Sequence, residues 1–268
     1  MLRRWCIPLA GLALVGAALA ASAPAAASAP AAAASHPARP TIHLIRPAMH
    51  GTAPIAVRGR SANAVLSTNW SGYAASGRST SVSATWTEPT GHCTSSSTFS
   101  VFWVGLDGFG SRSVEQTGSE VDCSGGHAKY FGWYEMFPAL PVSYSNPVRP
   151  GDHLAGSVTF TGSGHYTLVL KDTTQGWSHT IQKTRNAAKN ASAEVIAEAP
   201  ADAFTGAVLP LTNFGTAHFS NAAVNGAAMG NANPTKIIMV NASGRAKDSV
   251  SALTGGTAFS VTWLHSTR

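Results

Sequence analysis

The sequence lacks the motifs of enzymes that work through a metal, a nucleotide or a nucleophilic serine. It has no HExxH zinc segment, no GxSxG turn and no Walker loop, and its ten histidines are scattered without metal-ligand spacing. The paired Asp-Thr-Gly segments of pepsin-like proteases are also missing. We therefore expect no metal and no cofactor. A hydrolase of this composition is left with carboxylate and amide side chains.

Cysteine is scarce, with three residues in 268. Cys6 lies in the N-terminal leader, which leaves Cys93 and Cys123 in the rest of the chain. An even number of cysteines in an oxidising compartment favours a disulfide, here closing a loop of about 30 residues. Two buried free thiols are the alternative.

Acidic residues are few and confined to one region. All 12 lie after position 60, whereas six of the 18 Lys and Arg residues precede it. The remaining 12 basic residues (18 − 6) balance the acidic ones, so the net charge of +6 belongs to the N-terminal segment. Without a basic cluster after position 60, we expect no nucleic-acid partner.

Composition divides the chain into three parts. Residues 1–20 have the basic start, apolar stretch and Ala-Leu-Ala site of a secretory signal peptide. Residues 21–60 are rich in Ala and Pro, which indicates a propeptide or linker. Residues 61–268 are long enough for one domain. No second long apolar stretch follows, so we expect a secreted protein with no membrane association after signal removal, and a monomer by default.

Residues 61–268 predict an all-β domain. Apolar residues alternate with polar ones in 81–87, 154–160, 165–171 and 258–264, and residues 129–137 are apolar on both faces. Short strands separated by Gly, Ser, Asn and Pro favour a sandwich or a barrel. The apolar segment 129–137 suits a central strand that is covered on both sides.

Several acidic residues lie in strand-like segments. In 192–200, Glu194 and Glu198 would share one face of a strand, either as the floor of a cleft or on a solvated edge strand. Glu135 would share its face with aromatic side chains, where a carboxylate needs a partner or a wet cleft. Asp107 could line the same cleft or simply cap a turn.

Seven segments, in order along the chain, carry a family resemblance. They are Asn69-Trp-Ser-Gly-Tyr73, Ser83-Ala-Thr-Trp-Thr-Glu-Pro89, Phe102-Trp-Val-Gly-Leu-Asp-Gly108, Gln116-Thr-Gly118, Trp133-Tyr-Glu-Met-Phe-Pro138, Ala193-Glu-Val-Ile-Ala-Glu198 and Phe214-Gly-Thr-Ala-His-Phe219. With these segments the chain resembles the glutamic peptidases, or eqolisins. The resemblance spans about 150 residues.

The resemblance implies a sandwich of two large antiparallel sheets and names a set of site residues. Gln116 and Glu194 match the catalytic pair. The supporting positions around the cleft are Trp70, Trp103, Asp107, Glu135 and Glu198. The chain departs from the family pattern at Val195, where the family has Trp, and at Glu120, where it has Asp.

The implied activity is a secreted acid endopeptidase that cleaves protein and peptide substrates. Glu194, with a carboxyl pKa near ~4, would activate water as general base, and Gln116 would stabilise the oxyanion. The basic pro-segment could cover the acidic cleft at neutral pH.

Two other functions remain open from the residues alone. A β-sandwich glycoside hydrolase could use Glu135 and Glu194, which would need carboxyl groups about 5–5.5 Å apart for retention. A non-catalytic lectin-like module could use Trp103, Trp133 and Tyr134 for binding.

Overall fold

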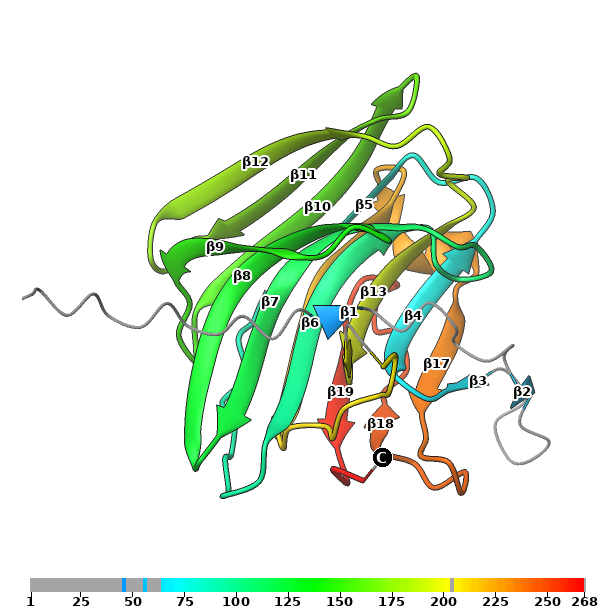
Figure 1. The fold of residues 1–268 in the computed structure, drawn as a ribbon. Helices are drawn as coiled ribbons and strands as arrows, with labels where there is room; N and C mark the ends of the chain where they lie inside the picture. Colours follow the sequence, from blue (N-terminus) through cyan, green and yellow to red (C-terminus); the bar gives the residue numbers. More distant parts are fainter. Residues whose placement is uncertain (1–44, 47–54, 57–63, 203–204, 268) are drawn as a thin grey trace, which may run out of the picture. The chain divides into compact units, whose positions relative to one another are not determined.

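The computed structural model describes residues 45–46, 55–56, 64–202 and 205–267. The predicted signal peptide and most of the predicted propeptide therefore lie outside the described residues. Two sheets form the layers of a sandwich (Figure 1), which confirms the expected all-β class. Within the described ranges, the chain forms no helix long and apolar enough to cross a membrane.

The larger sheet has nine strands. In spatial order they are β2 (Ile55–Ala56), β3 (Ala64–Ser67), β17 (Thr235–Met239), β4 (Trp70–Ser76), β13 (Ser192–Glu198), β6 (Thr98–Leu106), β7 (Val114–Ser124), β8 (His127–Phe137) and β9 (Val142–Pro147). Neighbours are antiparallel except β3 and β17, which are parallel. In Figure 1, β6, β7 and β8 run side by side as the longest strands of this sheet.

The second sheet has eight strands. Its path is β12 (Trp177–Thr184), β11 (His165–Asp172), β10 (His153–Gly162), β5 (Ser81–Thr87), β15 (Thr216–Val224), β19 (Phe259–Trp263) and β18 (Asp248–Val250), with β16 (Ala227–Ala228) paired to β15. A 3-10 helix, Met229–Ala232, follows β16. Separately, β1 (Ile45–Arg46) pairs with β14 (Ala201–Asp202).

The main core lies between the two sheets. Alternate residues of β6 and β13, such as Phe102, Val104 and Val195, pack with Trp86 and Leu168 of the second sheet. Because side chains in a strand alternate between faces, the intervening residues of β6 and β13 point to the outer face of the larger sheet. That outer face carries a second apolar cluster, which includes Trp70, Trp103, Trp133, Phe137 and Ile196.

The predicted strands are confirmed, with small shifts at their ends. Residues 81–87 form β5 as expected, and the other three alternating segments lie in β10, β11 and β19. Strand β8, expected to be central, is one strand from the sheet edge, because β9 covers it. It is nevertheless packed on both faces, with Met136 in the main core and Trp133 in the second cluster.

The predicted disulfide is present. Cys93, in the loop before β6, is bonded to Cys123 of β7, 30 residues further along the chain. Replacing both cysteines by serine is expected to lower the free energy of unfolding by about 3 kcal/mol, because the unfolded chain regains the entropy of that loop. Urea unfolding at pH 4 measures the difference, and equal stability of the two proteins would contradict the expectation.

Candidate active site

Strand register brings the predicted site residues into three rows on the outer face of the larger sheet. The rows run across β4, β13, β6, β7 and β8. The first row is Ala74, Glu194, Gly105, Gln116 and Glu135; the second is Gly72, Ile196, Trp103, Gly118 and Trp133; the third is Trp70, Glu198, Val101, Glu120 and Phe131. Successive rows are two residues apart along each strand, or about 7 Å.

Glu194 and Gln116 flank a glycine in the first row. Both pair with Gly105 of β6, so their Cα atoms are two strand spacings apart, about 10 Å. A Cβ atom on Gly105 would lie 3.2 Å from the Cβ of Gln116 and 2.8 Å from the Trp103 ring. The glycine therefore lets the ring of Trp103 lie against the backbone between the two functional side chains.

The amide of Gln116 is oriented by Glu135. Its Nε2 donates a hydrogen bond of 2.7 Å to Oε2 of Glu135. An amide nitrogen carries two hydrogens, so one N–H remains to donate elsewhere. Glu135 is fully buried, and a buried carboxyl group beside aromatic side chains was expected to need a partner. Gln116 is such a partner.

Glu194 is fully buried on β13, a central strand, so the edge-strand alternative is wrong. Burial raises its pKa well above the ordinary carboxyl value, and the negative charge of Asp107 adds to the effect. The expectation of a pKa near that of a free carboxyl is therefore wrong for this structure. The physical reason is desolvation, which favours the neutral acid.

Glu198 holds two neighbours in place. Its Oε2 accepts a hydrogen bond of 2.8 Å from Trp103 Nε1, and its Oε1 accepts one of 2.8 Å from Asn69 Nδ2. Trp103 in turn makes an edge-on contact with Trp70, with ring centroids 4.9 Å apart. Glu198 thereby fixes the aromatic surface between the first and third rows.

Asp107 does not lie in the rows. It follows β6 with a φ of 69° and accepts hydrogen bonds of 2.8 Å from the backbone N–H groups of Lys189, Asn190 and Ala191. These contacts position the loop that leads into β13. Of the two expected roles, a cap of a turn therefore describes Asp107 better than a lining of the cleft. Asp107 affects the site indirectly, because the loop that it binds leads to Glu194.

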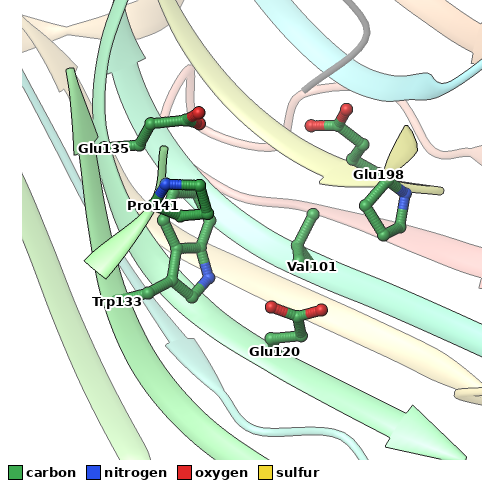
Figure 2. Close-up of a pocket in the computed structure, with 7 residues that line it drawn as sticks. Val101, Glu120, Trp133, Glu135, Pro141 and Glu198 are labelled. Carbon is green, nitrogen blue, oxygen red and sulfur yellow. The ribbon is translucent and has the colours of Figure 1, made fainter. Parts of the chain in front are cut away.

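A small pocket lies beside the first row. Its lining residues are Val101, Glu120, Trp133, Glu135, Pro141, Glu198 and Pro200. Figure 2 shows the carboxyl groups of Glu135 and Glu198 pointing toward one another, with Glu120 on the opposite side of Val101. The pocket's volume of about 10 Å³ is enough for about one water molecule, so it is a small depression between these side chains.

The structure assembles six of the seven predicted residues on one face. Glu194, Gln116, Glu135, Glu198, Trp103 and Trp70 all lie in the rows, whereas Asp107 does not. Sequence reasoning missed Asn69 and Gly105 as site residues. Both stood in the quoted segments, but only strand pairing reveals what they contact.

The geometry argues against the glycosidase pair. Glu194 and Glu135 are three strand spacings apart in the first row, about 14 Å between Cα atoms. Gln116 stands between them and is bonded to Glu135. A direct pair of carboxyl groups about 5–5.5 Å apart, as retention needs, does not fit this arrangement.

The fold and the rows define a β-sandwich with carboxyl and amide groups on the outer face of one sheet. The family model of the Peptidase A4 family matches residues 68–263. The chain belongs to this family and is a glutamic-type peptidase, a hydrolase. No curated protein sequence matches the chain.

Solved structures share the fold. The chain is similar to scytalido-glutamic peptidase with a transition state analog inhibitor, with a TM-score of 0.66 and 22% identity over 74% of this chain and 98% of that one. The chain is also similar to SCP-B, a member of the eqolisin family in complex with the tripeptide Ala-Ile-His. The TM-score is 0.60 and the sequence identity 22%, over 74% of this chain and 98% of that one. For aspergilloglutamic peptidase from Aspergillus niger, the TM-score is 0.56 and the sequence identity 23%, over 62% of this chain and 99% of that one.

Proposed function

We propose that this protein is a secreted acid endopeptidase whose catalytic pair is Glu194 and Gln116. The observation that carries the proposal is the first row, where a carboxyl group and an amide oriented by Glu135 pair with Gly105 from either side. Peptide hydrolysis needs a proton acceptor for water, a donor for the carbonyl oxygen and a proton for the leaving amine. These two side chains supply all three.

The reaction proceeds through a single tetrahedral intermediate. Ionised Glu194 takes a proton from water while the water oxygen bonds to the carbonyl carbon. The free N–H of Gln116 donates to the oxygen that becomes negative. The C–N bond then breaks, and the amine nitrogen receives the proton from Glu194, which leaves a carboxylic acid and an amine as products.

Work at acid pH requires the cleft to be hydrated. In the covered site, burial keeps Glu194 neutral by raising its pKa. Water that enters with the substrate removes part of this desolvation, and the pKa falls toward the ordinary carboxyl range. The neutral Gln116 has no charge to oppose ionisation, in contrast to the paired carboxyl groups of an aspartic protease dyad.

Secretion and processing belong to the same proposal. A signal peptide at 1–20 delivers the chain to an oxidising compartment, where the Cys93–Cys123 bond persists. The segment 21–60 acts as a propeptide in this proposal, because its only charged residues are four arginines, opposite in sign to the carboxyl groups of the site. A peptide of residues 21–60 is therefore tested as an inhibitor at neutral pH, and no inhibition would count against this role.

Digestion of a denatured protein from pH 2 to 7 tests the proposed activity. We expect cleavage at internal peptide bonds with a maximum on the acid side, and none of a panel of polysaccharides. Cleavage of polysaccharide with no proteolysis at any pH would overturn the proposal.

Replacing Glu135 by Gln is expected to lower kcat about 10- to 100-fold with little change in KM. The variant keeps the shape of the side chain but adds an amide nitrogen, which can donate to the Gln116 oxygen where Glu135 Oε2 accepts from Gln116 Nε2. Gln116 can then turn its oxygen toward the substrate carbonyl. Steady-state kinetics at several pH values measure the effect, and an unchanged kcat would show that Glu135 does not position the amide.

A further inference from the structure

Charge is divided unequally between the interior and the surface of the domain. Of the 12 acidic residues, ten are buried: Glu88, Asp107, Glu115, Glu120, Glu135, Asp152, Asp172, Glu194, Glu198 and Asp248. The other two, Asp122 and Asp202, are partly exposed. Among the described residues from 64 to 267, Lys247 is the one buried basic side chain, and ten other Lys and Arg residues are exposed or partly exposed. Equal residue counts therefore do not give a neutral surface.

The buried acids do not offset these surface cations at acid pH. Burial raises the pKa of Glu88 and of Glu115 to about 8 and that of Asp248 to about 7, so all three are neutral at pH 5. The pKa values of Glu120 and Glu194 are raised by burial as well. The surface of the domain is therefore cationic under the conditions of the proposed activity.

Four exposed basic side chains lie at one end of the sandwich, where the β4–β5 turn, the β10–β11 turn and the chain between β12 and β13 meet (Figure 1). They are Arg78, His165, Lys183 and Lys189, and we call them the basic end. Histidine is the side chain that gains a positive charge in mildly acidic water, so all four contribute positive charge there. Backbone hydrogen bonds of 2.7–2.8 Å join these segments, donated by Gly77 to Ala191, by Phe160 to Thr80 and by Arg185 to Gly164.

The basic end has no exposed counter-ion. Neither Arg78 nor Lys189 forms an ion pair with a described residue. The two acids beneath this end are already engaged. Asp107 accepts three backbone N–H groups, and Glu115 lies 3.6 Å from Arg185. Positive charge therefore remains available for an external anion.

Two open depressions connect the side chains of the basic end. One has a volume of about 390 Å³ and is lined by Arg78 and Lys189, and the other has about 620 Å³ and is lined by His165 and Lys183. They adjoin where the Tyr166 hydroxyl of the second donates a hydrogen bond of 2.7 Å to Asn190 of the first. Neutral hydrogen-bonding side chains also line the second depression: Thr161, Thr167, Gln182 and Thr184. The surface thus combines cations with hydroxyl and amide groups.

We propose that the basic end is a docking surface for an acidic polysaccharide, a polymer of sugar units that carry carboxylate groups. Arginine and lysine pair with carboxylates, and threonine and glutamine side chains donate to and accept from sugar hydroxyls. The inference goes beyond the proposed peptidase function and does not depend on it. None of the residues of the basic end lies in the three rows, so the polymer and the peptide substrate use different residues.

The character of this surface favours a polysaccharide over a membrane or a nucleic acid. The exposed large apolar side chains, Leu140, Val142 and Leu264, lie outside the basic end, whereas a lipid surface takes up apolar side chains beside the cations. Single-stranded nucleic acid stacks its bases on free aromatic rings. The two aromatic residues of the depressions, Phe160 and Tyr166, instead pack on one another with ring centroids 5.2 Å apart.

Binding to polygalacturonate, a linear polymer of galacturonic acid, tests the docking surface. The secreted protein is titrated into the fluorescently labelled polymer at pH 5, and the same polymer with its carboxyl groups methyl-esterified is the uncharged control. We expect saturable binding to the charged polymer alone, and about tenfold weaker binding at 200 mM than at 50 mM NaCl, because ion contacts release counterions. Equal binding to both polymers, or binding to neither, would overturn the proposal.

Charge reversals locate the binding surface. The double variant Arg78→Glu, Lys189→Glu is expected to bind polygalacturonate at least about tenfold more weakly, and Arg78→Gln, Lys189→Gln to show a smaller loss. The control is Lys129→Glu, Arg245→Glu, which changes the net charge equally at two exposed residues outside the basic end. Circular dichroism at pH 5 verifies the fold of each variant. An equal loss in the reversal and in the control would show that overall charge binds the polymer, and would refute the docking surface.

Two further comparisons separate this inference from the proposed function and from a nucleic-acid partner. Glu194→Gln should bind polygalacturonate as strongly as the wild type, because docking needs no cleavage. Polymer binding without proteolysis by the wild type would keep the docking surface and refute the peptidase, and proteolysis without polymer binding would do the reverse. Tighter binding of a single-stranded RNA homopolymer than of polygalacturonate, at the same pH and salt, would overturn the assignment to a polysaccharide.

Discussion

The free energy of unfolding is expected to be highest near pH 4 and to fall by several kcal/mol by pH 8. The cause is a set of buried carboxyl groups whose pKa values are raised chiefly by desolvation. Burial raises the pKa of Glu88 and of Glu115 to about 8 each, and that of Asp248 to about 7. All three side chains are almost fully buried, so solvent screening does not reduce the effect.

The direction of this change with pH follows from the number of protons bound by the folded and the unfolded chain. Below about pH 4 these groups are protonated in both states and do not discriminate between them. Between about pH 4.5 and 8 for the two glutamates, and between about pH 4 and 7 for Asp248, the unfolded chain releases protons that the folded chain keeps, so each group lowers stability by at most about 1.4 kcal/mol per pH unit. Domains are typically stable by only about 5–15 kcal/mol, so a loss of several kcal/mol is a large fraction of the total.

Lys247 affects the free energy of unfolding at a higher pH than these carboxyl groups do. Burial lowers its pKa to about 8, so the folded chain loses this proton before the unfolded chain does. Stability from this group therefore increases only between about pH 8 and 10.5, where the unfolded lysine still keeps its proton.

Glu88→Gln isolates one of these groups. A neutral amide can still accept the hydrogen bond that the Ser119 hydroxyl donates to the Glu88 side chain. We expect no gain at pH 4 and a gain of a few kcal/mol at pH 7, measured by urea unfolding at each pH. Stability that is flat or rises from pH 4 to 8 in the wild type would contradict the predicted protonation states.

Loss of either member of the catalytic pair is expected to reduce kcat more than any other substitution in the site. Gln116→Ala removes the oxyanion donor, which typically costs about 10²–10³ in kcat. Glu194→Gln removes the proton acceptor and donor, with an expected loss of about 10²–10⁴. Glu194→Gln also removes a buried acid, so this variant should be at least as stable as the wild type at neutral pH.

KM separates this interpretation from a binding role. In a lectin-like module, both substitutions would weaken binding and no turnover would be measured in the wild type. In the peptidase, KM should change by less than kcat, because the lost interactions are made mainly in the transition state. Circular dichroism of each variant at pH 4 controls for the fold.

Periodicity was sufficient to predict most of the local structure. Strands such as β5 and β11 show strict alternation, and a period of two places Glu194 and Glu198 on one face whatever the sheet order. The family segments then selected Gln116 as the partner of Glu194. What no single segment contains is register, because Glu194 pairs with Gly105, a residue 89 positions earlier in the chain (194 − 105).

The roles of Asp107 and Asn69 also depend on contacts distant in sequence. Asp107 binds a loop that begins 82 residues later, and Asn69 contacts Glu198 at a separation of 129 residues. The pKa of Glu194 was mispredicted for a similar reason. Alternation indicates which face a carboxyl group occupies, but the degree of desolvation depends on what covers that face.

The most direct test of the account is a double-mutant cycle on one peptide substrate. It compares kcat/KM at acid pH for the wild type, Glu194→Gln, Gln116→Ala and the double variant, all with an intact fold. Because the two groups act on the same transition state, the double variant should be little slower than the slower single variant. Near-wild-type hydrolysis in either single variant would contradict the assignment of Glu194 and Gln116 as the catalytic pair.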